Sequence, residues 1–169
     1  MSDTLLLRVL GIAAILGGAL RIVSAFIPWA PGQLWLEGLY LAIDLCLLFG
    51  LMGIYFAYRE TLGVLGFAAF AVAETGIASI VGPDGVVPEW GVDAYQLGVA
   101  IITVGLSLFA VALLATRSGA PWGPLCWLVS AVVGVGAFYS GEAEIGFLAG
   151  GLFFGLGFVL AGLPLLRRG

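Results

Sequence analysis

The stretch FAVAETGIASI, residues 70–80, places a glutamate, Glu74, in the middle of a long apolar run. The run around it is long enough to cross a bilayer, because a spanning helix needs about 20 predominantly apolar residues. An ionised side chain within such a span costs ~2.5–3.5 kcal/mol on insertion scales. The residues around Glu74 therefore bear on two questions, whether the chain spans a membrane and what the carboxyl group is for.

The whole chain shares the apolar character of this stretch. Of its 169 residues, 62% are hydrophobic and 9% are charged, whereas ordinary soluble domains carry roughly 25% charged residues. The mean hydropathy is +1.19, and the 27 glycines are typical of membrane helices, where glycine is more frequent than in soluble ones. The composition predicts a polytopic integral membrane protein whose first partner is the lipid bilayer.

Several classes of chemistry are excluded by residues that the sequence lacks. It has no histidine, which excludes histidine-ligated metals and histidine acid–base pairs. It has no lysine, which excludes a Schiff base. Cys46 and Cys126 lie singly in different apolar runs, and the net charge of −4 gives no basic surface for nucleic acid. We therefore expect no metal, no cofactor and no nucleic-acid partner.

Six apolar runs, separated by short polar segments such as PWAPGQ and RSGAP, give the expected helices. We place these helices at residues 5–27, 34–57, 61–82, 95–116, 122–140 and 145–166. The break between the second and third helices falls at YRE, residues 58–60. The sequence thus predicts one all-α domain, a bundle of six transmembrane helices.

Arginine, the only cation in the chain, predicts the orientation of this bundle. Arginines lie near the two chain ends and in the second and fourth turns: Arg8, Arg59, Arg117, Arg167 and Arg168. The first, third and fifth turns have none, and acids gather in two of them: Asp84, Glu89, Asp93, Glu142 and Glu144. By the positive-inside rule, both termini are expected in the cytoplasm, with the bundle in a bacterial inner membrane.

Three charged residues within the spans are the candidate site. A rise of 1.5 Å per residue puts Arg21, Asp44 and Glu74 roughly 9, 15 and 12 Å from the outer ends of their helices. Consecutive helices joined by short loops are usually neighbours, so we expect the three side chains to meet in one layer of the outer half of the bilayer. An arginine between two carboxylates would offset much of the cost of burying them.

The helix at 34–57 extends this layer toward the outside. Glu37, Tyr40 and Asp44 fall near one helical face, which predicts a narrow polar pocket rimmed by Glu37 and Tyr40. The charged layer could hold three helices in register, form a ligand, ion or proton site, or contact a partner subunit. Because it carries one surplus negative charge, a proton, a cation or water is expected to join it.

The last predicted helix carries two pairs of glycines in GxxxG spacing, Gly146 with Gly150 and Gly151 with Gly155. Small residues at this spacing let helices approach closely, within one chain or between chains. The motif is common in membrane helices, so packing inside the bundle is favoured over a dedicated dimer interface.

Three classes of function remain, and the sequence ranks them. The first is an accessory, assembly or ligand-binding subunit of a membrane complex, with other membrane subunits or a second copy of the chain as partners. The second is a proton- or cation-coupled small transporter or channel that uses the charged layer, although no polar path is evident in the inner half. The third is an intramembrane lipid-modifying enzyme, for which no catalytic residue is identified because the spans hold no pair of nucleophile and base.

Overall fold

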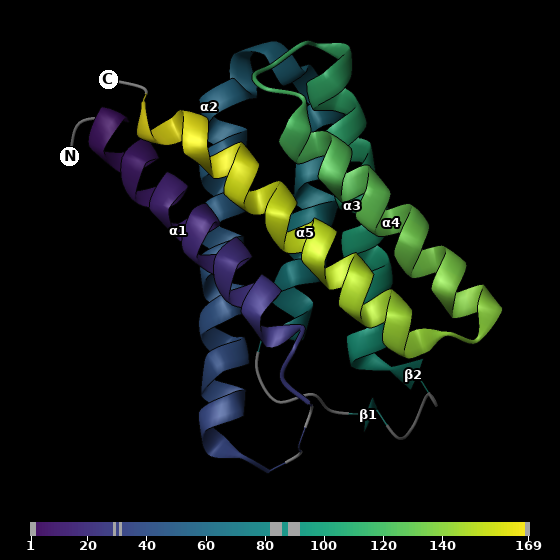
Figure 1. Cartoon of the computed structure of the whole chain (residues 1–169). Coiled ribbons are helices and arrows are strands. Elements are labelled where there is room, and N and C mark those ends of the chain that lie inside the picture. Colours follow the sequence, from purple (N-terminus) through teal and green to yellow (C-terminus); the bar gives the residue numbers. More distant parts are fainter. Residues whose placement is uncertain (1–2, 29, 31, 82–85, 88–91, 168–169) are drawn as a thin grey trace.

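The computed structural model describes residues 3–28, 30, 32–81, 86–87 and 92–167 (Figure 1). Its helices are α1 (Asp3–Ser24), α2 (Leu34–Ile80), α3 (Ala94–Ala115), α4 (Trp122–Ser140) and α5 (Ala143–Leu166). Two short antiparallel strands, β1 (Val86–Val87) and β2 (Val92–Asp93), lie between α2 and α3. All five helices are long and apolar enough to cross a membrane. The prediction of a helical protein suited to a bilayer is confirmed at this level.

The number of helices differs from the prediction, because α2 contains 47 residues without the expected break. Residues 58–60 are helical, and the irregular residue is Gly63, with φ 59° and ψ −162°. A straight helix of this length would measure ~70 Å, but Figure 1 shows the chain reversing near the top of α2. We refer to residues 34–62 and 64–80 as the first and second segments of α2.

Other boundaries shift by a few residues. α1 ends at Ser24 rather than at residue 27, and a tighter turn follows in which the Ile27 amide donates to the Ser24 carbonyl at 3.1 Å. The two strands occupy a segment expected to be a plain loop. Gly82, at the end of the third predicted helix, lies outside the described residues, as do Asp84, Glu89 and Arg168.

Glycines bring α1 close to two neighbours. On one side, a Cβ at Gly17 would lie 2.9 Å from the Leu47 backbone nitrogen, in the first segment of α2. On the other side, the backbones of Gly18 in α1 and Gly155 in α5 meet so closely that a Cβ on either would overlap the carbonyl oxygen of the other. The first and last helices of the chain are therefore in direct contact, which small residues permit.

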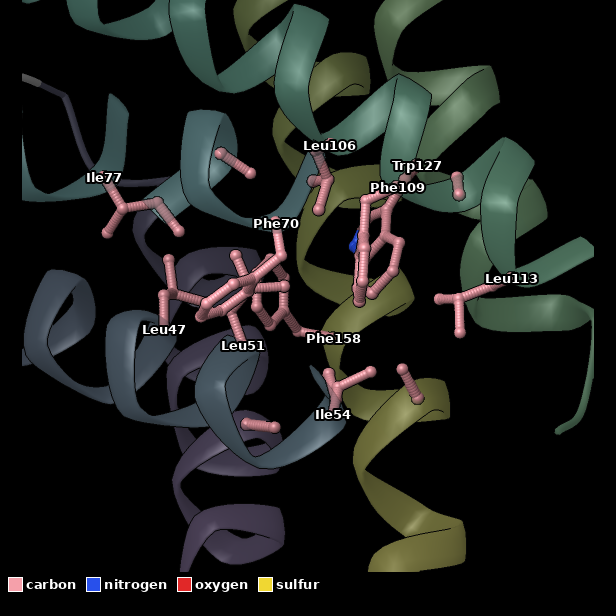
Figure 2. Packing of buried hydrophobic residues seen from close by; sticks show 14 of the residues in the cluster. Leu47, Leu51, Ile54, Phe70, Ile77, Leu106, Phe109, Leu113, Trp127 and Phe158 are labelled. Atoms are coloured by element: carbon pink, nitrogen blue, oxygen red, sulfur yellow. The ribbon is translucent and has the colours of Figure 1, made fainter. Parts of the chain in front are cut away.

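Aromatic side chains fill the middle of the bundle (Figure 2). The Phe109 ring lies 6.3 Å from Phe70 and 6.4 Å from Trp127, whose ring is 5.1 Å from Phe158, measured between centroids. These four residues come from the second segment of α2 and from α3, α4 and α5, and all are buried. Aromatic rings thus fill the core in the middle of the bundle.

The two ends of the bundle differ in charge. At one end, Thr61 Oγ1 and Ser118 Oγ are 2.6 Å apart, which joins the reversal of α2 to the turn between α3 and α4. Both termini lie at this end (Figure 1), and we call it the arginine end because Arg59, Arg117 and Arg167 belong to it. The opposite end carries Glu37, Glu142 and Glu144, all exposed, and we call it the acidic end.

Candidate functional site

The packing of α1 against α2 gives the level of Arg21 in the bundle. A Cβ on Gly53 would overlap Leu10, one on Gly50 would overlap Ala14, and one on Gly17 would touch Cys46 and Leu47. α1 and the first segment of α2 therefore pack antiparallel, and the register between them is the same at all three glycines. One helical turn beyond Gly17, Arg21 comes level with residues 42–43, close to the level of Asp44.

The side chain of Arg21 nevertheless lies against α5. Its Nη1 donates to Ser24 Oγ at 3.2 Å, and its guanidinium carbon is 4.7 Å from the centre of the Phe147 ring. A Cβ on Gly151 would lie 3.1 to 3.4 Å from three guanidinium atoms. Within the described part of the chain, neither Asp44 nor Glu74 forms a salt bridge with Arg21. The structure does not bring the expected three charges into contact.

Asp44 lies on a face of α2 that is turned toward the second segment of the same helix. Glu37, Tyr40, Asp44 and Tyr55 share this face by helical spacing. Tyr55 stacks on Phe70 of the second segment, with ring centroids 4.3 Å apart and planes at 12°. α1 packs instead on the face of Gly50 and Gly53. Asp44 therefore lies on a different face of α2 from the one that contacts α1, the helix of Arg21.

The same stacked rings give the level of Glu74. Tyr55 contacts both Phe67 and Phe70, and Leu47 and Ile77 belong to one buried cluster (Figure 2). In this antiparallel register, Glu74 is level with Gly50 and Leu51. Asp44 is six or seven residues nearer the acidic end, a rise of about 9–10 Å. The two acids therefore follow one another along the bundle.

The carboxyl group of Glu74 is the clearest unexplained group in the described residues. Both of its oxygens are buried, and neither has a hydrogen-bond partner there. Its neighbours along the helix, Phe70, Ala73 and Ile77, belong to the apolar core. A carboxylate enclosed in this way is costly, and it becomes stable when a proton, a cation or a donor group neutralises it.

Four polar residues lead from the acidic end toward this group. Glu37 is exposed, Tyr40 and Asp44 are half-buried one and two turns further along, and Glu74 follows about two turns beyond. We call Glu37, Tyr40, Asp44 and Glu74 the acidic strip. By helical spacing these residues fall on the sides of the two segments of α2 that face each other, and Tyr55 stacks on Phe70 about one turn beyond Glu74.

The four glycines singled out in the sequence lie on two sides of α5. Gly146 meets Ala137, and the Gly150 carbonyl accepts a hydrogen bond of 2.8 Å from Ser130 Oγ, so this pair faces α4. Gly151 and Gly155 face Arg21 and Gly18 of α1. No sequence pattern indicates the roles of Ser130 and Phe147, because both depend on the packing of α5 against its neighbours.

A surface groove of about 420 Å³ lies far from the acidic strip, at the arginine end. Its charged residues, Asp3, Arg59 and Glu60, are all exposed, as ordinary surface charges are. In the described residues, no three acidic or cysteine side chains gather closely enough to hold a metal ion. Among the described residues, the acidic strip and Arg21 are therefore the candidate functional groups.

Comparison of this chain with models of protein families, with curated proteins and with solved structures finds no significant match.

Proposed function

We propose that this chain is a small integral membrane protein that acts as a ligand-binding or accessory subunit of a membrane complex. In this proposal, Glu74 receives a cationic or hydrogen-bond-donating group from the ligand or from the partner subunit. The observation that carries it is the buried Glu74 carboxyl without a donor among the described residues. Arg21 lies on α5 instead of beside this carboxyl, which disfavours a purely structural role for the charged residues.

The acidic strip indicates the chemistry of the bound group. Its acids create a negative potential that attracts cations and repels anions. The stack of Tyr55 on Phe70 limits the depth to which a group can enter. A compact ammonium group, on a small amine or on a basic side chain of a partner, has the charge and the size to reach Glu74 from the acidic end.

The placement in the membrane is part of the proposal. We infer that the two segments of α2 each cross the bilayer, which gives six crossings in all, because one straight helix of 47 residues would exceed a hydrocarbon core of about 30 Å. Arg59, Arg117 and Arg167 gather at one end, which favours a cytoplasmic location for that end and both termini. The membrane would then be a bacterial inner membrane.

The direct test is purification of the full chain with a tag after Gly169, in mild detergent, followed by native mass spectrometry. We expect the wild type to retain a ligand or a foreign subunit at stoichiometric amount. Glu74→Gln should lose it because amide and carboxyl have similar shapes but only the carboxyl carries a charge. Glu60→Gln, a change of the same kind at an exposed position outside the acidic strip, should keep it. A wild-type protein that carries no ligand or foreign subunit would contradict the proposal.

A second measurement separates binding from a structural role. In the ligand-free protein, Glu74→Met should raise the unfolding temperature, because it removes a buried polar group without a hydrogen-bond partner among the described residues, which costs about 1–3 kcal/mol. If Glu74 instead holds the helices in register, the same change should lower that temperature. Glu37→Met is the matched control and should change little.

Transport of a proton or cation is the second candidate, because the acidic strip connects Glu74 with one end of the bundle. The stacked rings and the aromatic core beyond it argue against a continuous path. Purified protein in liposomes should therefore show no proton or cation flux. Flux that Glu74→Gln abolishes and Glu60→Gln preserves would favour the transporter instead.

A further inference from the structure

Arg21 is set apart from the other described arginines by its place in the fold. It lies in the last turn of α1, toward the acidic end, whereas Arg59, Arg117 and Arg167 lie at the arginine end and Arg8 lies near the N-terminus. The proposed binding role of Glu74 does not use it. Its charge therefore needs an explanation of its own, since an unpaired cation within an apolar bundle is costly.

The residues around Arg21 hold its guanidinium in place but accept few of the hydrogen bonds that it can donate. The ring of Phe147 lies against it, and Ser24 Oγ accepts one hydrogen bond while donating another, of 2.9 Å, to the Arg21 carbonyl. A guanidinium has five N–H donors, and this is the one bond that it donates within the described part of the chain. Gly151 has no side chain and so leaves room for the group on α5.

The site lies at the surface of the bundle rather than in its interior. Arg21 is half-buried, and near it Val23, Phe26 and Phe147 expose 57%, 65% and 42% of their surfaces. In a membrane-spanning chain such apolar groups face acyl chains. Arg21 lies three residues from the end of α1, about 4.5 Å along the helix axis, a depth from which a long side chain reaches the headgroup region.

We propose that Arg21 binds the phosphate group of an anionic glycerophospholipid at the contact between α1 and α5, near the acidic end. The planar guanidinium matches two phosphate oxygens through parallel charge-assisted hydrogen bonds. Ser24 and Phe147 are positioning residues that hold the fork, and the exposed apolar surfaces of α1 and α5 contact the acyl chains. Glu37, Glu142 and Glu144 at this end repel a soluble anion, whereas a lipid arrives sideways through the bilayer.

The test is native mass spectrometry of the full chain in detergent micelles that contain phosphatidylglycerol or phosphatidylcholine. We expect one phosphatidylglycerol to bind the wild type in preference to phosphatidylcholine. Arg21→Gln should weaken this binding about tenfold or more, as expected for a lost charge-assisted pair. Arg8→Gln, the matched change near the opposite end of α1, should leave it intact. Equal binding by wild type and Arg21→Gln, or equal binding of the two lipids, would overturn the proposal.

Two further measurements keep the result interpretable. Inorganic phosphate at the concentration of the lipid should fail to displace it, and displacement would show a site for free phosphate instead. Gly151→Ala places a methyl group against three atoms of the flexible Arg21 side chain and favours the helix, so the bundle should fold while the guanidinium moves. Tight phosphatidylglycerol binding by folded Gly151→Ala would also count against the proposal.

Discussion

At the scale of single residues, Gly157 shows how closely the helices of this bundle approach. The Trp127 indole is 1% exposed, and it lies so near Gly157 that a Cβ there would overlap its Cδ1 and Nε1 atoms. The indole nitrogen has no hydrogen-bond partner in the described part of the chain, which costs free energy. Packing of the large ring therefore outweighs a lost hydrogen bond at this position.

Gly157→Ala is expected to lower the free energy of unfolding by about 1–3 kcal/mol, because the added methyl group overfills a tightly packed contact. The measurement is thermal or denaturant unfolding in detergent. Gly136→Ala in α4 is the control, since nothing lies within 4 Å of its Cβ position and alanine favours a helix. If both variants unfold like the wild type, the result would contradict the close packing of Trp127 against Gly157.

The relative depth of Arg21 and Asp44 could be predicted from the sequence, but the depth of Glu74 and the partners of the three charged residues could not. Helical rise predicts Arg21 and Asp44 near the level that the packing gives them. It also puts Glu74 in the same layer, whereas the ring contacts place Glu74 about 9–10 Å farther from the acidic end than Asp44. It could not give the direction in which a long side chain turns, and carboxylates were the obvious partners for a cation. Arg21 instead reaches Phe147 and Gly151 on α5, a helix more than a hundred residues further along the chain.

At the scale of elements, α2 shows that the polar triplet at residues 58–60 continues a helix instead of breaking it. Tyr58, Arg59 and Glu60 look like a turn between apolar runs, but arginine and glutamate are good helix formers and both are exposed here. The helix continues until Gly63, whose φ of 59° and ψ of −162° lie in a region accessible almost only to glycine. The reversal therefore depends on a backbone conformation rather than on polarity.

Gly63→Ala is expected to destabilise the protein by about 1–3 kcal/mol, since a Cβ strains this backbone conformation even though no atom lies within 4 Å of it. Unfolding in detergent measures the change. Gly38→Ala is the matched control in the same helix, because its Cβ position is equally open while its backbone is helical. Equal stability of the two variants would contradict the assigned turn at Gly63.

At the scale of the whole molecule, the order of the helices could be predicted only in part. Chain order suggested that consecutive helices would be neighbours, and α1 does pack on α2. The contact between α1 and α5, through Gly11, Gly18, Gly155 and Gly162, joins opposite ends of the sequence. Glycine spacing marks a surface for close packing but not the helix that covers it, so this contact required the three-dimensional structure.

The arrangement of the two ends leads to a prediction about topology. With Cys46 and Cys126 replaced by alanine, single cysteines at Gln33, Glu60 and Glu142 can be treated with a membrane-impermeant maleimide. These three positions are exposed. In intact bacterial cells we expect labelling at Gln33 and Glu142, whereas Glu60→Cys should react only after the membrane is permeabilised, because the proposed topology puts the arginine end in the cytoplasm.

This pattern depends on the first segment of α2 crossing the bilayer between residues 33 and 60, a distance of roughly 40 Å along a helix. Labelling of both Gln33→Cys and Glu60→Cys in intact cells would show that the first segment does not cross. The reverse pattern, with Glu60→Cys alone accessible, would place the termini outside. The acidic end would then face the cytoplasm, and both the entry to Glu74 and the lipid at Arg21 would belong to the inner leaflet.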